Sequence, residues 1–167
     1  MEIRKSKIED IHQILEVIHD AQDSMRDNGI PQWQDGYPNE VIIFQDIQAE
    51  NSYVLVDGKR IVGTAYIIAE HEPSYDYIEG GQWLNNHPYV VVHRIAVRKD
   101  CRGKGIARYI MEFAEKIAKE HQLHDIRIDT HDDNLPMRKF LLKLGYHACG
   151  TIYLDNGDKR IAYQKTF

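Results

Sequence analysis

A strongly β-forming run, a glycine-bearing basic loop and a long amphipathic helix follow one another in this chain and constrain its fold more than any other feature. The run at residues 89–97 is rich in valine and isoleucine, and the loop at residues 98–105 follows it directly. Apolar residues then recur at helical spacing from Ile106 to about His121. Glycines at a helix start let several backbone N–H groups converge on an anion. The pattern therefore predicts a phosphate-binding turn between a strand and a helix.

The loop reverses the charge of the rest of the chain. Asp100 is the sole acid among the basic residues Arg98, Lys99, Arg102, Lys104 and Arg108, whereas the whole chain has 21 Lys+Arg against 26 Asp+Glu and a net charge of −5. The local sign favours a polyphosphate. The overall sign argues against a nucleic-acid or anionic-membrane partner. The loop matches neither the P-loop nor the dinucleotide fingerprint, and by itself it is also compatible with a plain turn that carries solvated charges.

Apolar periodicity and turn residues predict the other elements. In chain order we expect a short strand at Ile3, a helix entered through a capping box of Ser6 and Glu9 and ending near Asn28, a helix capped by Asn39, a hairpin of residues 53–56 and 61–68, the strand and helix described above, a strand over 126–130, a helix opened by Asn134 and closed by Gly145, and a hairpin of 152–154 and 160–163.

Length and cysteine content point to an ordinary globular chain. The 167 residues predict a single domain over 1–167 with a core that needs no metal or disulfide support. Cys101 and Cys149 are too few for a disulfide scaffold or a zinc site, and the histidines form no metal-binding motif, so no metal is expected. No leader or membrane span is apparent, which favours a cytoplasmic protein with no membrane partner.

Two motif regions resemble those of the Gcn5-related N-acetyltransferases. Residues 102–107, Arg-Gly-Lys-Gly-Ile-Ala, are similar to that family's Q/R-x-x-G-x-G/A motif and follow a strand end at residues 95–97. Residues 134–146 resemble a second family region, with Asn134 at a helix start and Gly145-Tyr146 at its end. The resemblance implies an α/β (α+β) GNAT-like acyl-CoA N-acyltransferase fold, in which about four helices flank a mixed central sheet of about seven strands.

The resemblance also implies a co-substrate and the residues that hold it. Acetyl-CoA would lie where the strand ending at residue 97 splays from the strand at 126–130, with the pantetheine arm on the first strand and the pyrophosphate on the loop amides. The implied cofactor-binding residues are Ile95, Ala96, Val97, Arg102, Gly103, Lys104, Gly105, Ile106, Ala107, Arg108 and Asn134.

A histidine on the same strand is the candidate catalytic residue. An alkylamine is free base only about once in two thousand molecules at pH 7, so a base that removes its proton helps directly. His93 resembles the second of two strand histidines in arylalkylamine N-acetyltransferases, and strand alternation places Arg94 on the opposite face. A histidine that only packs in the strand is the alternative. Leu141 stands where the family often has a tyrosine acid, which leaves that role to Tyr146, to water or to no group.

The acceptor is inferred from loop aromatics. Trp33, Tyr37 and Trp83 are the candidate substrate-binding residues, and nearby acidic residues suit a cationic amine. We expect an acetyl-CoA-dependent N-acetyltransferase that acts on a primary amine, of a small molecule, by direct transfer in a ternary complex. The alternatives are acetylation of a protein N-terminus or lysine, and a non-catalytic coenzyme A-binding regulatory module. A homodimer stays open.

Overall fold

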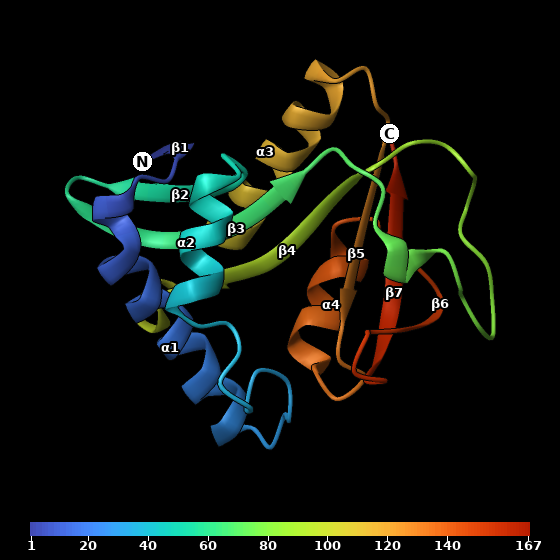
Figure 1. Ribbon diagram of the computed structural model, residues 1–167, viewed down its shortest axis with the longest axis horizontal. Helices are drawn as coiled ribbons and strands as arrows, with labels where there is room; N and C mark the ends of the chain where they lie inside the picture. The colour runs from blue at the N-terminus through green and yellow to red at the C-terminus, as the bar shows by residue number, and fades with distance from the viewer. The chain divides into compact units, whose positions relative to one another are not determined.

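The computed structural model describes all 167 residues and shows seven strands and four helices (Figure 1). The elements are β1 (Glu2–Lys5), α1 (Ile11–Asp27), α2 (Glu40–Gln48), β2 (Ser52–Asp57), β3 (Arg60–Ile68), β4 (Val90–Val97), α3 (Ile106–Glu120), β5 (Asp125–Thr130), α4 (Leu135–Lys143), β6 (His147–Tyr153) and β7 (Lys159–Thr166). Short 3-10 helices lie at Ile8–Asp10, Pro73–Tyr75 and Lys99–Cys101. This order confirms the predicted sequence of elements.

The strands form one mixed sheet in the order β1-β2-β3-β4-β5-β7-β6. β1, β2 and β3 pair antiparallel in turn, and β7 pairs antiparallel with both β5 and β6. β4 and β5 are parallel, with Val90 opposite Ile126 and Val91 opposite Arg127. A parallel pair needs a crossover, and the connection between these two strands contains α3. The mixed sheet confirms the predicted fold class.

The chain packs as two compact units. The first unit comprises Met1–Ile67 with His93–Phe113, and the second comprises Ile68–Val92 with Ala114–Phe167. The single domain expected over residues 1–167 stays a prediction. No helix combines the length and the apolar character that crossing a membrane requires.

In the first unit, α1 and α2 cover one face of β2 and β3. The buried side chains of α1 recur at helical spacing, and with apolar residues of α2 and the strands they form one core. That core consists of Ile14, Val17, Ile18, Ala21, Ile43, Ile47, Val54, Ile61 and Ala96.

The entry to α1 differs from the predicted capping box. Its first turn is a 3-10 helix in which the Asp10 carboxylate accepts a 2.7 Å hydrogen bond from the Lys7 amide. The Ser6 hydroxyl instead bonds to that of Ser52, 2.7 Å away. The Ser6–Glu9 box was therefore wrong, because Ser6 pairs with β2.

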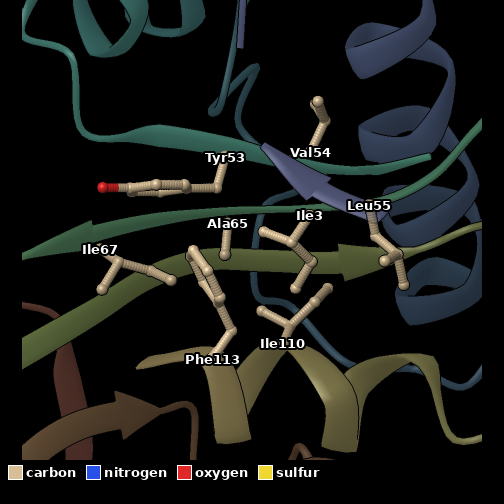
Figure 2. A pocket seen from close by; sticks show the side chains of 8 residues that line it. All are labelled: Ile3, Tyr53, Val54, Leu55, Ala65, Ile67, Ile110 and Phe113. Atoms are coloured by element: carbon tan, nitrogen blue, oxygen red, sulfur yellow. The ribbon is translucent and has the colours of Figure 1, made fainter. Parts of the chain in front are cut away.

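The opposite face of these strands packs against the first turns of α3. Figure 2 shows Ile110 and Phe113 of α3 pointing toward the strands, while Val54 points away from them. The Phe113 ring meets Tyr53 edge-on at 5.3 Å. The hollow that remains is lined by Ile3, Tyr53, Val54, Leu55, Ala65, Ile67, Ile110 and Phe113. Since Tyr53 supplies the sole polar group of this lining, the hollow is a gap in the core and offers no charge to a substrate.

In the second unit, the long segment between β3 and β4 is fixed by its aromatic side chains. Tyr75, in the short helix Pro73–Tyr75, is fully buried, and its hydroxyl donates a 2.6 Å hydrogen bond to Asp129 of β5. Burial, followed by the Asp129 carboxylate, raises the pKa of Tyr75 well above its ordinary value, so the hydroxyl stays a donor. The contacts of this short helix make the segment part of the core.

The Tyr75 hydroxyl provides a test of this anchoring. We expect Tyr75→Phe to lower the free energy of unfolding by about 1.5–3 kcal/mol, because it removes a buried hydrogen bond to a carboxylate. Tyr77→Phe is the matched control, since the exposed Tyr77 hydroxyl donates to Glu79 at 3.1 Å and its loss should change stability by less than about 0.5 kcal/mol. Urea denaturation measures both. Equal effects of the two substitutions would contradict a buried anchor.

Candidate functional site

The loop between β4 and α3 has the backbone that its glycines predicted. Gly103 and Gly105 have φ values of 75° and 81°, in the left-handed region that favours glycine. A Cβ built on either glycine would meet no atom within 4 Å, so conformation and not crowding requires glycine, and the space beside the loop is open. The Gly105 carbonyl accepts the Tyr109 amide at 3.0 Å and starts α3. The amides of the first turn of α3 therefore have no acceptor within the helix and are available to an anion.

Arg98, at the end of β4, is a structural residue. It is 8% exposed, its Nε donates to the Ile61 carbonyl at 2.6 Å, and Nη2 donates to Glu16 of α1 at 2.6 Å. Hydrogen bonding from Arg98 is the main cause that lowers the pKa of Glu16. The guanidinium therefore ties β3 and α1 to the point where the chain leaves β4.

Further contacts fix the loop on α1. The Lys99 amide donates to the Asp20 carboxylate at 2.9 Å, and Arg102 donates to the Ser24 hydroxyl at 2.6 Å and to the Asp20 carbonyl at 3.1 Å. Arg102, predicted to bind the cofactor, thus points at α1. Lys104 and Arg108 are exposed. They are the better placed of the predicted basic residues to meet a polyphosphate.

His93 and Arg94 do not follow strand alternation. Arg94 has a φ of 52°, which is unfavourable for a residue with a Cβ, by about 1–2 kcal/mol. Its guanidinium lies 4.6 Å from the centre of the Tyr66 ring, and the His93 ring lies 6.1 Å from the same ring. Both side chains therefore reach Tyr66 of β3. The prediction of opposite faces was wrong because the left-handed residue interrupts the pleat.

Arg94 joins three parts of the first unit. Its Nε and Nη2 donate to the two carboxylate oxygens of Asp46 in α2 at 2.7 and 2.6 Å, and its Nη1 donates to the Tyr37 hydroxyl at 2.8 Å. Burial alone would lower the pKa of Arg94, but Tyr37 and Asp46 more than offset it, so the pKa lies above its ordinary value and the side chain stays charged. Asp46, Tyr66, His93, Arg94 and Tyr37 thus form one cluster, which we call the strand β4 cluster.

Sequence reasoning missed the roles of Asp46, Tyr66 and Arg94. The available signal was the pair of polar residues His93-Arg94 inside a run of valine and isoleucine. Two adjacent polar residues break the pattern of a buried strand, and such a break is typical of a local backbone irregularity.

The loop before α2 brings Tyr37, but not Trp33, to this cluster. Gln22 of α1 donates to the Tyr37 carbonyl at 3.0 Å, which anchors the loop. Trp33 has a φ of 62° and packs, partly buried, against the core of the first unit. Trp33 thus has a packing role in the core of the first unit. Its predicted contact with an acceptor stays a prediction.

Trp83 lies in the second unit and is engaged in packing. Its Nε1 donates to the Tyr75 carbonyl at 2.8 Å, and its ring lies 5.1 Å from the Tyr75 ring. The Arg127 guanidinium sits 4.1 Å from the Trp83 ring and 4.1 Å from the Tyr89 ring, between two aromatic faces. The predicted contact of Trp83 with the acceptor likewise stays a prediction.

The second motif region places Asn134 as the cap of α4. The Asn134 side-chain oxygen accepts the Met137 amide at 3.3 Å, and Pro136 lies in the first turn. Leu141 of the same helix is fully buried. The predicted helix start is confirmed, and the role of Asn134 toward a cofactor stays a prediction. No group of three histidine, cysteine, aspartate or glutamate side chains is arranged to hold a metal ion.

Tyr146 is a buried residue whose hydroxyl has no hydrogen-bond partner. It is 2% exposed, and burial followed by the Glu115 carboxylate raises its pKa far above the ordinary value. The sequence leaves the acid role to Tyr146, to water or to no group, and these buried surroundings favour a packing role for Tyr146.

Comparison with known proteins identifies the family. The model of the acetyltransferase (GNAT) family matches residues 13–146. An acetyltransferase of the GNAT family from Streptococcus agalactiae is 37% identical, with a TM-score of 0.89 over 99% of this chain and 95% of that one. The chain belongs to the GNAT acetyltransferase family. This confirms the resemblance and agrees with the prediction of an N-acetyltransferase that uses acetyl-CoA.

Two further relatives bear on ligands. Streptothricin acetyltransferase from Escherichia coli is 38% identical over 59 residues, which is 35% of this chain, so the match spans about a third (34%) of that curated relative. The PaiA N-acetyltransferase from Thermoplasma acidophilum, solved in complex with coenzyme A, is 17% identical, with a TM-score of 0.70 over 99% of this chain and 98% of that one. The latter likeness shows the fold alone.

The unpartnered hydroxyl of Tyr146 predicts the sign of a stability change. We expect Tyr146→Phe to leave the free energy of unfolding unchanged or to raise it by about 1 kcal/mol, because a buried hydroxyl without a partner is costly. The change is opposite in sign to that expected for Tyr75→Phe, and the same urea titration measures it. A loss above about 1 kcal/mol would mean that the hydroxyl is hydrogen-bonded in solution.

Proposed function

We propose that this chain transfers the acetyl group of acetyl-CoA to a primary amine of a small molecule, by direct transfer in a ternary complex. The observation that carries the proposal is the left-handed glycine loop at the start of α3, within the same compact unit as His93. Membership of the GNAT family supports the reaction class.

The loop suits the pyrophosphate of coenzyme A. The space beside Gly103 and Gly105 is open, the first-turn amides of α3 have no acceptor within the helix, and Lys104 and Arg108 add positive charge. The predicted set of residues 95–97, 102–108 and Asn134 is retained as the proposed binding site, with Arg102 supporting the loop through α1.

The strand β4 cluster is the proposed place of the chemistry. His93 takes the proton of the acceptor ammonium, directly or through one water, and so supplies the free amine. The amine nitrogen then forms a bond to the thioester carbonyl carbon as the carbon–sulfur bond breaks, and the sulfur leaves with the electron pair of that bond. The nitrogen releases its second proton to solvent, which leaves the neutral amide. Because Tyr146 is buried, solvent is the proposed source of the proton that the sulfur takes up.

A small acceptor is favoured over a protein. The relative that is 38% identical over its matched segment is named for the acetylation of streptothricin. In this chain, the Tyr37 hydroxyl accepts a hydrogen bond from Arg94, the residue that directly follows His93, so the loop of Tyr37 is tied to the strand that carries the proposed base. The alternatives, a protein amine or a regulatory module without catalysis, are separated by the assays below. A cytoplasmic location and a homodimer stay predictions.

The loop can be tested by coenzyme binding. We expect acetyl-CoA to raise the melting temperature of the wild type, since ligand at about 100 times its Kd adds about 2.7 kcal/mol. Gly105→Asp should lose most of the shift because it sets a carboxylate against the pyrophosphate. Gly105→Asn is the matched control, because asparagine has the shape of aspartate and a similar tolerance of positive φ but carries no charge. This variant should keep more of the thermal shift than Gly105→Asp. Absence of a shift in folded wild type would remove the cofactor proposal.

His93 can be tested by the pH dependence of the rate. We expect kcat/KM to rise with pH, and His93→Ala to lose this rising limb and about 10²–10⁴ in rate. An acceptor amine of low pKa is already unprotonated and removes the amine's own titration from the profile. Unchanged acetyl-CoA affinity in His93→Ala controls for damage to the strand. Equal profiles in both enzymes would leave His93 as a packed strand histidine, and no acetylation of any amine would favour the regulatory module.

A further inference from the structure

The left-handed backbone of Arg94 directly follows the proposed base. A residue with a Cβ adopts a φ of 52° within a strand only when its surroundings hold it there. Such conformations cluster at functional sites, where they aim a neighbouring side chain. The question is what holds Arg94.

The side chain of Arg94 is held on three sides. Asp46 of α2 receives two hydrogen bonds, the Tyr37 hydroxyl receives a third, and the Tyr66 ring lies against the guanidinium at 4.6 Å. The side chains of Arg94 and Asp46 are only 14% and 10% exposed. Solvent therefore competes weakly for these contacts, and the planar fork of arginine matches the carboxylate in a way that lysine cannot.

We propose that Asp46, Arg94 and Tyr37 form a clamp that positions His93 and the acceptor loop together. The inference rests on the proposed function, in which His93 is the base. Asp46 fixes the direction of Arg94, and this fixes the irregular backbone that turns His93 toward Tyr66. Through its other nitrogen, Arg94 holds the loop of Tyr37, so the acceptor loop and the base have a common anchor. Arg94 is a positioning residue and does not itself react.

A matched pair in the same unit separates positioning from stability. Arg4 of β1 also binds a buried carboxylate with two hydrogen bonds, to Asp10 at 2.7 and 3.0 Å. Neither residue of that pair has a positive φ, and neither belongs to the strand β4 cluster. Asp10→Asn should therefore lower stability as Asp46→Asn does, without moving His93.

The experiment combines steady-state kinetics with NMR of protein labelled with ¹³C at the histidine ring carbon Cε1. His93→Ala identifies the His93 signal among those of the nine histidines. For Arg94→Lys and Asp46→Asn we expect a displaced or broadened His93 signal, a fall in kcat of about 10- to 100-fold, a flattened pH profile and acetyl-CoA affinity within about twofold of wild type. Asp10→Asn should leave the signal, kcat and pH profile unchanged. Arg94→Gly relieves the backbone strain but removes the clamp, and should behave like Arg94→Lys.

The two readouts keep this inference apart from the proposed function. An unmoved His93 signal in both Arg94→Lys and Asp46→Asn overturns the clamp, whatever their activity. A wild-type His93 signal in Arg94→Gly also overturns it, because backbone conformation alone would then suffice to position His93. A displaced signal with unchanged kcat supports the clamp and counts against His93 as the base.

Discussion

The buried guanidinium of Arg98 is the contact on which the arrangement of the first unit depends. It satisfies the Ile61 carbonyl of β3 and the Glu16 carboxylate of α1 at once, just where β4 ends. A buried charge is tolerable only when it is fully paired, so the position of this residue leaves little freedom to the chain on either side. The glycine loop therefore leaves the strand in a fixed direction, and α3 begins where its first-turn amides remain open.

The order of elements could be predicted from the sequence because each signal was local. The helical spacing of apolar residues in α1, the cap at Asn39 and the turn residues of the hairpins all act within a few positions of the chain. The same holds for Gly103 and Gly105, because the ability to adopt a positive φ is a property of glycine itself. The Ser6–Glu9 box failed, since Ser6 has a partner in β2 that lies far away in the sequence.

The site could be predicted only where backbone geometry decides it. The basic residues of the loop were read as one positive patch, but Arg98 and Arg102 turn to α1, whose polar groups no local pattern reveals. In the same way, strand alternation assumes a regular pleat, whereas Arg94 has a left-handed backbone and its side chain binds Asp46, which is distant in sequence. For a polar side chain that could bind either a ligand or another part of the chain, the sequence alone thus does not predict which partner it has.

The number of basic residues in the loop therefore overstates the charge that a polyphosphate would meet. The charge of Arg98 is offset by Glu16, whose carboxylate accepts a hydrogen bond from Arg98 at 2.6 Å. Arg102 donates hydrogen bonds to the Ser24 hydroxyl and to the Asp20 carbonyl, so its guanidinium is directed toward α1. The groups that remain available to an anion are the first-turn amides of α3 and the exposed side chains of Lys104 and Arg108. Amides are rigid and need no side-chain ordering on binding, so such a loop gains its affinity from preorganised dipoles more than from net charge.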